Sequence, residues 1–486
     1  MRKTFLLLAA AALALSPAAA QRLRTLDPQD VSEARQYNAA LVQELGGAET
    51  GPRAAYVNAV GHKVGAYAGI ANPGQSLHFT TLNSAVENAL SVPGGYVYVT
   101  RQLLALMDDE SQLAFALGHE VGHVAANHAH VREQYAQRSS FGVFGQILGA
   151  IFGPGAADLI RARSTLDLLS FSREQEYQAD TLGLRYMIGA GYDPVGAAGV
   201  LAALTRASAL ETRLQGRTNR RTPEWASTHP LSENRLQRAL AAAQATGRLG
   251  TGIRNRDVFL GELEGITVDD DPSQGVIEGA TFTHPDLRIQ FSVPQGYLMS
   301  NGSDAVTISG SAGKAQFRQG PPNLDQAISF AYRLLTRDRF QIGYPPPQRV
   351  VINGMQAALT TARVNTDSGM MDVSVIAYQW DAERVFYFAM LTPAGYGVTP
   401  FVPMINSLRR ITPSEAASIR PRVIHVETVR PGDTVYSLSS RMAYRDFKLE
   451  RFLSLNGLSA NSALVPGRKV KLVVLGNRTG AGPRTS

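Results

Sequence analysis

The spacing of hydrophobic residues divides the chain into segments of different character. Apolar side chains recur at helical spacing through residues 29–46 and 53–68. Short β-rich pieces follow on both sides of Pro93, and the run from residue 112 to 126 is rich in helix formers and has no proline. Residues 172–187 return to helical spacing. The first half is therefore expected to be mainly helical.

The second half has a different pattern. Residues 257–412 contain several alternating stretches, such as 287–293, with helical segments at 324–336 and 401–408. This order predicts an α+β sandwich. A polar linker at 413–423 precedes a strand–helix–helix–strand pattern over 424–474. The expected fold class is α+β and multidomain, ending in a disordered tail at 475–486.

The N-terminus indicates the compartment. Arg2 and Lys3 precede an apolar run over 5–15, and an Ala-x-Ala cleavage site ends at Ala20. These features are typical of a signal peptide, here residues 1–20, with the first domain at 21–250. The chain has no cysteine, which excludes a lipid-anchored lipoprotein and a disulfide framework. The periplasm is therefore the expected location.

Charge and length set broad limits. The net charge is +7 without a block of like charges, so nucleic-acid binding is not the favoured interpretation. The 486 residues suggest roughly three domains. The longest apolar stretch of the mature chain, residues 141–160, is interrupted by glycines and a proline. We expect a mobile hairpin near the cleft there, with a buried loop as the alternative, and no transmembrane span.

The candidate chemistry starts at His119, Glu120 and His123. On a helix, residues four apart lie one above the other, so both imidazoles can bind one metal ion. This HExxH pattern is typical of zinc peptidases, in which the glutamate takes a proton from the attacking water. Downstream, Glu176 can supply a third ligand, and Asp180 can accept the free N–H of a ligating histidine. We expect His128 and His130 to be solvated.

These residues occur together with Asn88, Ala89, Pro93-Gly94-Gly95, His229 and Arg235. In order and separation, residues 30 to about 245 resemble the HtpX and CAAX-prenyl-protease family, and most closely its soluble periplasmic BepA-like branch. The resemblance implies a gluzincin-like peptidase domain with one Zn²⁺ per chain. It also implies that Asn88 and Ala89 hold the substrate backbone. The C-terminal repeat array of BepA-like relatives is missing, so partner recognition must differ.

Two further resemblances concern the rest of the chain. Residues 424–474 resemble a LysM domain, whose family binds N-acetylglucosamine glycans, chiefly peptidoglycan. The alternative is a structural or protein-binding module. Residues 257–412 look like the PsbP-like fold, and no catalytic constellation is apparent in them.

The favoured function is a secreted zinc endopeptidase, with His119, His123 and Glu176 as ligands and Glu120 as the base. Its expected substrates are misfolded or stalled envelope proteins. His229 is the first candidate for the oxyanion donor, and Arg235 is the second. Alternatively, His229 is a switch that covers the zinc. A chaperone or adaptor and a peptidoglycan hydrolase are the rival functions.

Overall fold

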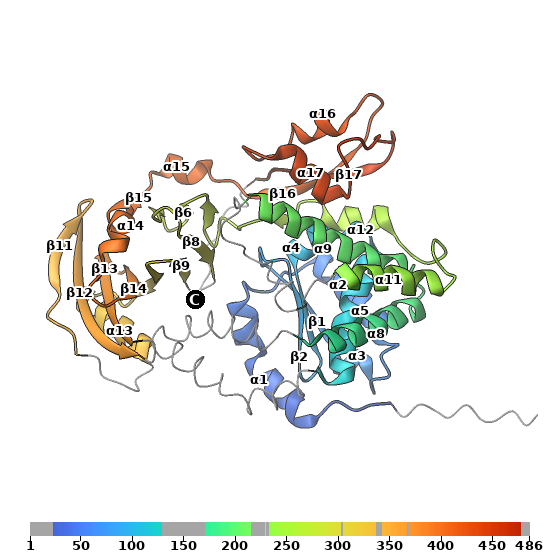
Figure 1. The fold of residues 1–486 in the computed structure, drawn as a ribbon, viewed down its shortest axis with the longest axis horizontal. Coiled ribbons are helices and arrows are strands. Elements are labelled where there is room, and N and C mark those ends of the chain that lie inside the picture. The colour runs from blue at the N-terminus through green and yellow to red at the C-terminus, as the bar shows by residue number, and fades with distance from the viewer. Residues whose placement is uncertain are drawn as a thin grey trace, which may run out of the picture.

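The fold is described from a computed structural model. The described residues are 23–128, 171–214, 229, 233–302, 305–336, 343–366 and 369–477. The predicted signal peptide, the 141–160 hairpin and His130 lie outside them. Figure 1 shows a mainly helical part, a separate sheet-rich part and a small C-terminal module beside the helical part.

The helical part surrounds a small sheet. The sheet has the order β1-β3-β2, in which β3 (Tyr96–Thr100) pairs in parallel with β1 (His78–Leu82) and antiparallel with β2 (Ala89–Val92). Among the described residues, β2 therefore pairs on one edge only. The helices are α1 (Pro28–Glu44), α2 (Pro52–Gly65), α3 (Pro73–Ser76), α4 (Arg101–Leu106), α5 (Glu110–Ala126), α8 (Arg173–Gly189), α9 (Val195–Leu214), α11 (Glu233–Ala245) and α12 (Arg256–Leu263).

The central helix α5 forms where the sequence predicts it. Its N-cap Asp109 accepts a hydrogen bond from the backbone N–H of Gln112, and nearly the whole helix is buried. It packs tightly on α8, because glycine at the crossing lets the two backbones approach. A Cβ on Gly183 would lie 2.8 Å from the backbone nitrogen of His119. This close crossing brings the residues of α8 to the two histidines of α5.

The sheet-rich part contains two antiparallel sheets. Its four-stranded sheet has the order β15-β7-β6-β5 and its seven-stranded sheet the order β11-β12-β13-β14-β10-β9-β8. The strands are β5 (Val276–Glu278), β6 (Thr281–His284), β7 (Ile289–Ser292), β8 (Leu298–Asn301), β9 (Val306–Gly310), β10 (Gly313–Gly320), β11 (Gln348–Ile352), β12 (Met355–Thr366), β13 (Gly369–Gln379), β14 (Val385–Pro393) and β15 (Arg409–Arg410).

Helices complete this middle domain. α13 (Leu324–Thr336) packs over one face of the large sheet. The opposite face forms a second core with the small sheet, the turn η1 (Thr399–Phe401) and α14 (Val402–Ser407). Helices and sheets therefore combine here as the alternating pattern predicted.

The C-terminal module has the predicted strand–helix–helix–strand order. β16 (Arg422–Thr428) pairs antiparallel with β17 (Lys469–Leu475), and α16 (Val435–Ser439) and α17 (Lys448–Asn456) lie between them in sequence. Thr434 caps α16, and Gly457 ends α17 in the left-handed conformation that favours glycine. The Asn456 side chain binds the backbone N–H and C=O of Lys471, which fixes α17 to β17.

Several secondary-structure elements lie across the predicted domain boundaries, which stay predictions. Residues 413–423, predicted as a linker, contain helix α15 (Pro413–Ser418) and the start of β16. Residues 257–268, assigned to the middle domain, form most of α12 and strand β4 (Thr267–Val268), which pairs with β16. Leu475, assigned to the tail, ends β17. Pairing with β16 accounts for β4 and for the end of β17, whereas α15 begins at a local capping box formed by Thr412 and Glu415.

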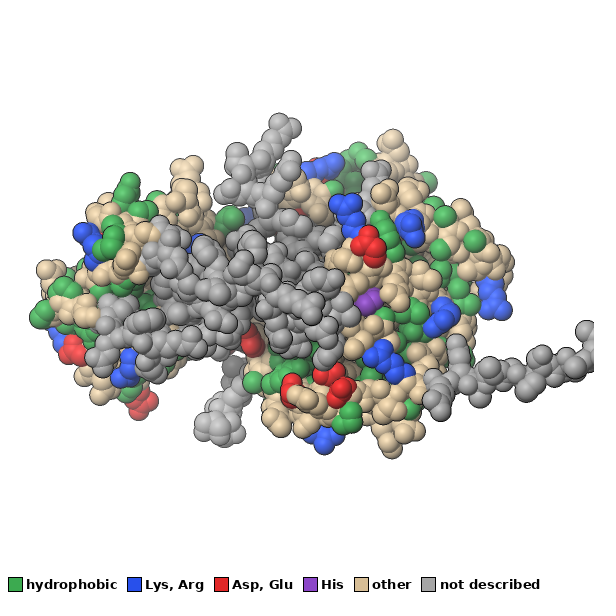
Figure 2. All heavy atoms as spheres, turned by 60° about the horizontal axis from the view of Figure 1, so that its bottom comes forward, with side chains coloured by type: hydrophobic (Ala, Val, Ile, Leu, Met, Phe, Trp, Pro, Cys, Tyr) green, Lys and Arg blue, Asp and Glu red, His purple; other side chains and the backbone are tan. Residues whose placement is uncertain are grey.

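Among the described residues, no helix has the length and apolar character needed to cross a membrane. Figure 2 shows basic and acidic side chains interspersed over the face drawn.

Candidate metal centre

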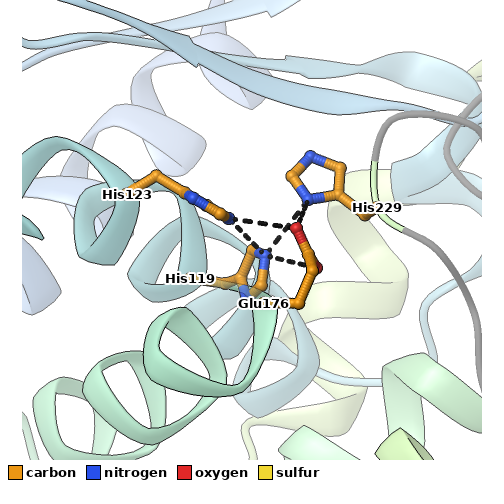
Figure 3. A group of neighbouring side chains, drawn as sticks. All are labelled: His119, His123, Glu176 and His229. Atoms are coloured by element: carbon orange, nitrogen blue, oxygen red, sulfur yellow. Dashed lines mark hydrogen bonds and ion pairs between the residues drawn. The ribbon is translucent and has the colours of Figure 1, made fainter. Parts of the chain in front are cut away.

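Four buried side chains converge on one point (Figure 3): His119 and His123 from α5, Glu176 from α8, and His229. Each offers one ligand atom, and the four atoms lie within 4.8 Å of one another. His119 Nε2 and His123 Nε2 are 3.0 Å apart, and each lies 3.5 Å from a carboxylate oxygen of Glu176. The structure therefore brings together the three ligands predicted from sequence.

His229 joins this group through Nδ1. That atom lies 2.9 Å from Glu176 Oε1 and 3.3 Å from His119 Nε2. The other ring nitrogen, Nε2, lies 3.3 Å from Glu120 Oε1. The His229 ring is thus between a ligand and the expected base.

Asp180 and Arg235 support the ligands from outside. Asp180 Oδ1 lies 3.0 Å from His119 Nδ1, the predicted neighbour, and this close carboxylate favours a neutral His119 with its proton on Nδ1 and the Nε2 lone pair directed at the cluster. Arg235 donates to both oxygens of Asp180 at 2.9 and 2.7 Å, and its Nη1 lies 2.6 Å from Glu176 Oε2. Its Nη1 also donates to the backbone carbonyl of His229 at 3.4 Å, so the contacts of Arg235 favour positioning over the predicted oxyanion-donor role.

The electrostatics of the centre favour a cation. Burial alone would lower the pKa of His119, but hydrogen bonds to Asp180 and Glu176 raise that pKa to about 9. For Glu176, an acid, burial has the opposite effect and would raise the pKa, but the charges of His229 and Arg235 hold the pKa of Glu176 well below its usual range. Glu176 is therefore an anionic ligand at neutral pH, and the carboxylates stabilise positive charge at His119 Nε2, the atom that would bind the metal.

The expected base lies beside the ligand cluster. Ser91 on β2 donates from Oγ to Glu120 Oε2 at 2.9 Å, and both side chains are buried. No sequence motif points to Ser91. Its contact with Glu120 depends on β2 and α5 lying side by side, which no local pattern reveals.

The predicted substrate-binding residues lie at the edge of the small sheet. Ala89 is the first residue of β2 and is buried. The backbone N–H of Asn88 donates to Thr100 Oγ1 at 3.1 Å, whereas Asn88 Oδ1 is buried without a hydrogen-bond partner among the described residues. The edge strand and this acceptor are near the metal centre because β2 packs on α5.

His128 corrects one prediction. We interpreted it as solvated, but it is only 3% exposed, and its Nδ1 lies 2.9 Å from Nδ1 of His123. Asn127 adopts a left-handed conformation with φ of 58°, which turns the chain after α5 and brings His128 back to His123. Phe171, also not predicted, stacks on the His123 ring at a centroid distance of 3.6 Å.

The donor set fits zinc. Two imidazole nitrogens and one carboxylate are typical of catalytic zinc sites, which keep a further position open. His119 presents Nε2 to the cluster while Asp180 binds its Nδ1, and this arrangement is common for ligating histidines. All four side chains are buried, so bulk solvent does not screen the repulsion between their converging lone pairs, which a bound cation would remove.

Comparisons with known proteins agree with this geometry. The sequence model of Peptidase family M48 matches residues 52–243, and that of the LysM domain matches residues 428–473. Residues 52–243 form an M48 peptidase domain. This family consists of zinc-dependent metallopeptidases, so the predicted zinc metallopeptidase domain and the LysM domain are confirmed.

The curated relatives match the same half of the chain. The beta-barrel assembly-enhancing protease of Escherichia coli strain K12 is 32% identical over 191 residues, which is 37% of this chain and 37% of the relative. The mitochondrial metalloendopeptidase OMA1 of Arabidopsis thaliana is 35% identical over 122 residues, 25% of this chain and 24% of the relative. The chain therefore spans little more than a third of the length of the first of these relatives.

Solved structures add little. Cyanobacterial PsbP from Synechocystis sp. PCC 6803 covers 28% of this chain and 98% of its own, at 12% identity and a TM-score of 0.22. A protein from Bacteroides thetaiotaomicron VPI-5482 reaches a TM-score of 0.23 at 12% identity, over 42% of this chain and 88% of its own. Such scores carry no argument, so the PsbP-like interpretation of the middle domain stays a prediction.

Proposed function

We propose that this protein is a secreted, periplasmic zinc endopeptidase that takes part in quality control of envelope proteins. One observation carries the proposal. His119, His123 and Glu176 converge in a buried site of a peptidase-family domain, with Glu120 directly beside them. A site that only stored or transported metal would have no need of an adjacent base.

The side chains divide the work of peptide hydrolysis. His119, His123 and Glu176 would hold the zinc ion, which when bound polarises a carbonyl and acidifies a water molecule. Glu120 takes a proton from the attacking water and returns it to the leaving amine. Ser91 holds Glu120 Oε2, so that Oε1 faces the cluster. Asp180 and Arg235 keep the ligands in place.

The substrate would bind along β2. Because this strand is an edge of its sheet, an extended peptide can add to it through backbone hydrogen bonds. The unpaired acceptor Asn88 Oδ1 supports a role in holding a substrate N–H, with Ala89 providing the backbone beside it.

His229 would act as a switch. Its Nδ1 lies among the donor atoms, in reach of the position that substrate or water must take, and its Nε2 approaches Glu120. A fourth protein ligand closes a catalytic zinc site. Turnover of a short quenched peptide by His229→Ala tests this. An increase is expected, whereas a loss of about 10²–10³ would instead identify His229 as an oxyanion donor.

The cellular role is inferred from the other segments and from relatives. Residues 1–20 have the features of a signal peptide, and several relatives bear the name beta-barrel assembly-enhancing protease. Misfolded or stalled outer-membrane proteins are therefore the proposed substrates. The LysM domain would attach the enzyme to peptidoglycan.

Casein and purified peptidoglycan, incubated separately with the protein, distinguish this proposal from its rivals. Zinc-dependent cleavage of casein alone is expected. Cleavage of peptidoglycan would favour a glycan hydrolase. Binding of unfolded casein without cleavage would favour a chaperone or adaptor.

A further inference from the structure

His128 forms the far end of a chain of hydrogen bonds that begins at the metal ligand His123. The two Nδ1 atoms are 2.9 Å apart, and His128 Nε2 lies 3.2 Å from Oε1 of Gln178 on α8. Both histidines are buried, at 2% and 3% exposure. The contact is on the side of the His123 ring opposite to the ligand cluster, because Nε2 of His123 faces His119.

Ligand chemistry fixes the direction of this chain. To bind metal, His123 must present a lone pair on Nε2, so the proton of the neutral ring is on Nδ1. That N–H can then donate only if His128 Nδ1 is an acceptor. The proton of neutral His128 is accordingly on Nε2, where it donates to the carbonyl oxygen of Gln178. Each bond in the chain requires the next.

We propose that His128 is a positioning residue for zinc binding, holding His123 in the tautomer and ring orientation that the metal requires, with Gln178 holding His128. This inference rests on the zinc site of the proposed function. His128 would then support Nδ1 of His123, as Asp180 supports Nδ1 of His119. The two ligands of α5 are therefore supported differently, one by a carboxylate and the other by a neutral imidazole.

Phe171 explains why a side-chain acceptor is needed. Its ring stacks on His123 at 3.6 Å and lies 6.0 Å from His128. An aromatic ring in this position shields one face of His123 but offers no acceptor to its N–H. Without His128, that buried N–H would lose its partner, which is costly in an apolar environment.

Two substitutions, His128→Asn and His128→Gln, test the inference. Both introduce an amide group, but they place it at opposite ends of the space that the imidazole ring occupies. His128→Asn puts its carbonyl oxygen close to the place of Nδ1, whereas His128→Gln puts its amide close to the place of Nε2. We expect His128→Gln to weaken zinc binding by about 10–100-fold, the usual loss for a removed partner of a ligand. His128→Asn should stay close to the unsubstituted protein.

The measurement is the zinc dissociation constant of the full chain, obtained by competition with a chelator. His425→Ala is the matched control, because it removes a half-exposed histidine of the LysM domain. Gln178→Ala should have a smaller effect than His128→Gln, since Gln178 is at the surface and water can replace it.

The outcomes separate this inference from the proposed function. If His119→Ala also leaves zinc affinity unchanged, the metal site itself is wrong. If His119→Ala abolishes binding while His128→Gln binds as tightly as the unsubstituted protein, only the role of His128 is overturned. Equal losses for His128→Asn and His128→Gln would indicate a packing role and would overturn it as well.

Discussion

The LysM domain and the middle domain are attached to the peptidase domain in different ways. The LysM domain shares a hydrophobic core with it: Val435, Leu438 and Phe452 belong to the same buried cluster as Leu103 and Met107. The middle domain has two cores of its own. The module that sequence patterns define as separate is thus the one most closely integrated with the enzyme.

A buried lysine strengthens the first attachment. Lys471 on β17 donates to the carbonyl oxygens of Ala105, Leu106 and Met107 at 2.7–3.2 Å, and lies 3.2 Å from Asp108. These carbonyls are at the end of α4, where a cation is stabilised by the helix dipole. The next residue, Asp109, caps the HExxH helix. The LysM domain therefore supports the loop from which the catalytic helix begins.

The middle domain meets the other parts mainly through polar contacts. Asn83 donates to Asp271 at 3.0 Å, Gln274 donates to the carbonyl of Gly46 at 2.9 Å, and Arg422 pairs with Glu278 at 2.7 Å. Contacts of this kind contribute little each when they are solvated. A domain boundary in the sequence pattern therefore does not locate a boundary in hydrophobic packing.

The largest expected effect comes from deleting each region in turn. Removing residues 424–486 should unfold the peptidase domain, because the shared core and the Lys471 contacts are lost. The cost should exceed about 5 kcal/mol, the lower range of a domain's net stability. Circular dichroism and resistance to an added protease measure whether the remaining chain is folded. A folded, zinc-binding product would contradict the shared core.

The matched deletion removes residues 269–421. Val268 and Arg422 are directly opposite each other in the β4–β16 pair, so an Asn-Gly turn can join them as a hairpin. The product should fold and bind zinc, since neither core of the middle domain is shared. Unfolding of this protein as well would remove the contrast between the two regions.

A smaller effect is expected from Lys471→Met. Burial lowers the pKa of Lys471, with Asp108 acting in the opposite direction, and the substitution leaves Asp108 without its buried partner. Breaking such a pair costs about 3–5 kcal/mol. Lys469→Met, two residues away on the same strand and paired only loosely with Asp257 at 3.9 Å, is the control. Denaturant unfolding should show a large loss for the first and almost none for the second.

The smallest effect concerns Asp270, where the three parts meet. Burial raises the pKa of Asp270 from 3.8 to about 6, partly offset by the hydrogen bond from the Ile277 N–H. The folded chain thus favours the protonated form, and this contribution to stability is lost as pH rises through about 6. Asp270→Asn keeps an acceptor for Ile277 and should stabilise the protein at pH 7 by about 1 kcal/mol.

Thermal unfolding at pH 7 and pH 5 checks this sign. The advantage of Asp270→Asn should shrink as the pH falls, because the carboxyl group of the unsubstituted protein becomes protonated. Asp269→Asn is the control: Asp269 accepts from Tyr444 at 2.9 Å, so its substitution should not stabilise the protein. A pH-independent difference for Asp270→Asn would exclude a buried charge as the cause.

The convergence of the candidate metal ligands could be predicted because helical spacing is local. His119, Glu120 and His123 are on one turn, and Glu176 and Asp180 repeat the same spacing on a second helix. The mixture of helices and strands in each part could likewise be predicted from the local alternation of hydrophobic and polar residues and from turn residues. His229 and the edge strand came only from the resemblance to a family.

What the sequence did not reveal depends on tertiary contacts. His128 reaches His123 through the left-handed turn at Asn127, which a pattern of i and i+4 positions does not describe. Lys471 alternates with Lys469 at the start of β17 and looks like a solvent-facing residue, because its partner Asp108 is more than 350 residues away. Such charges can be recognised as buried only when both partners are placed.

The central claim is that Glu120 is the base of a zinc peptidase and not a ligand. Zinc content by mass spectrometry and turnover of a quenched peptide, measured on one preparation of Glu120→Gln, test it most directly. We expect one zinc per chain with turnover reduced by at least about 10², the lower contribution of a general base. Turnover at the unsubstituted rate, or loss of zinc together with activity, would contradict it.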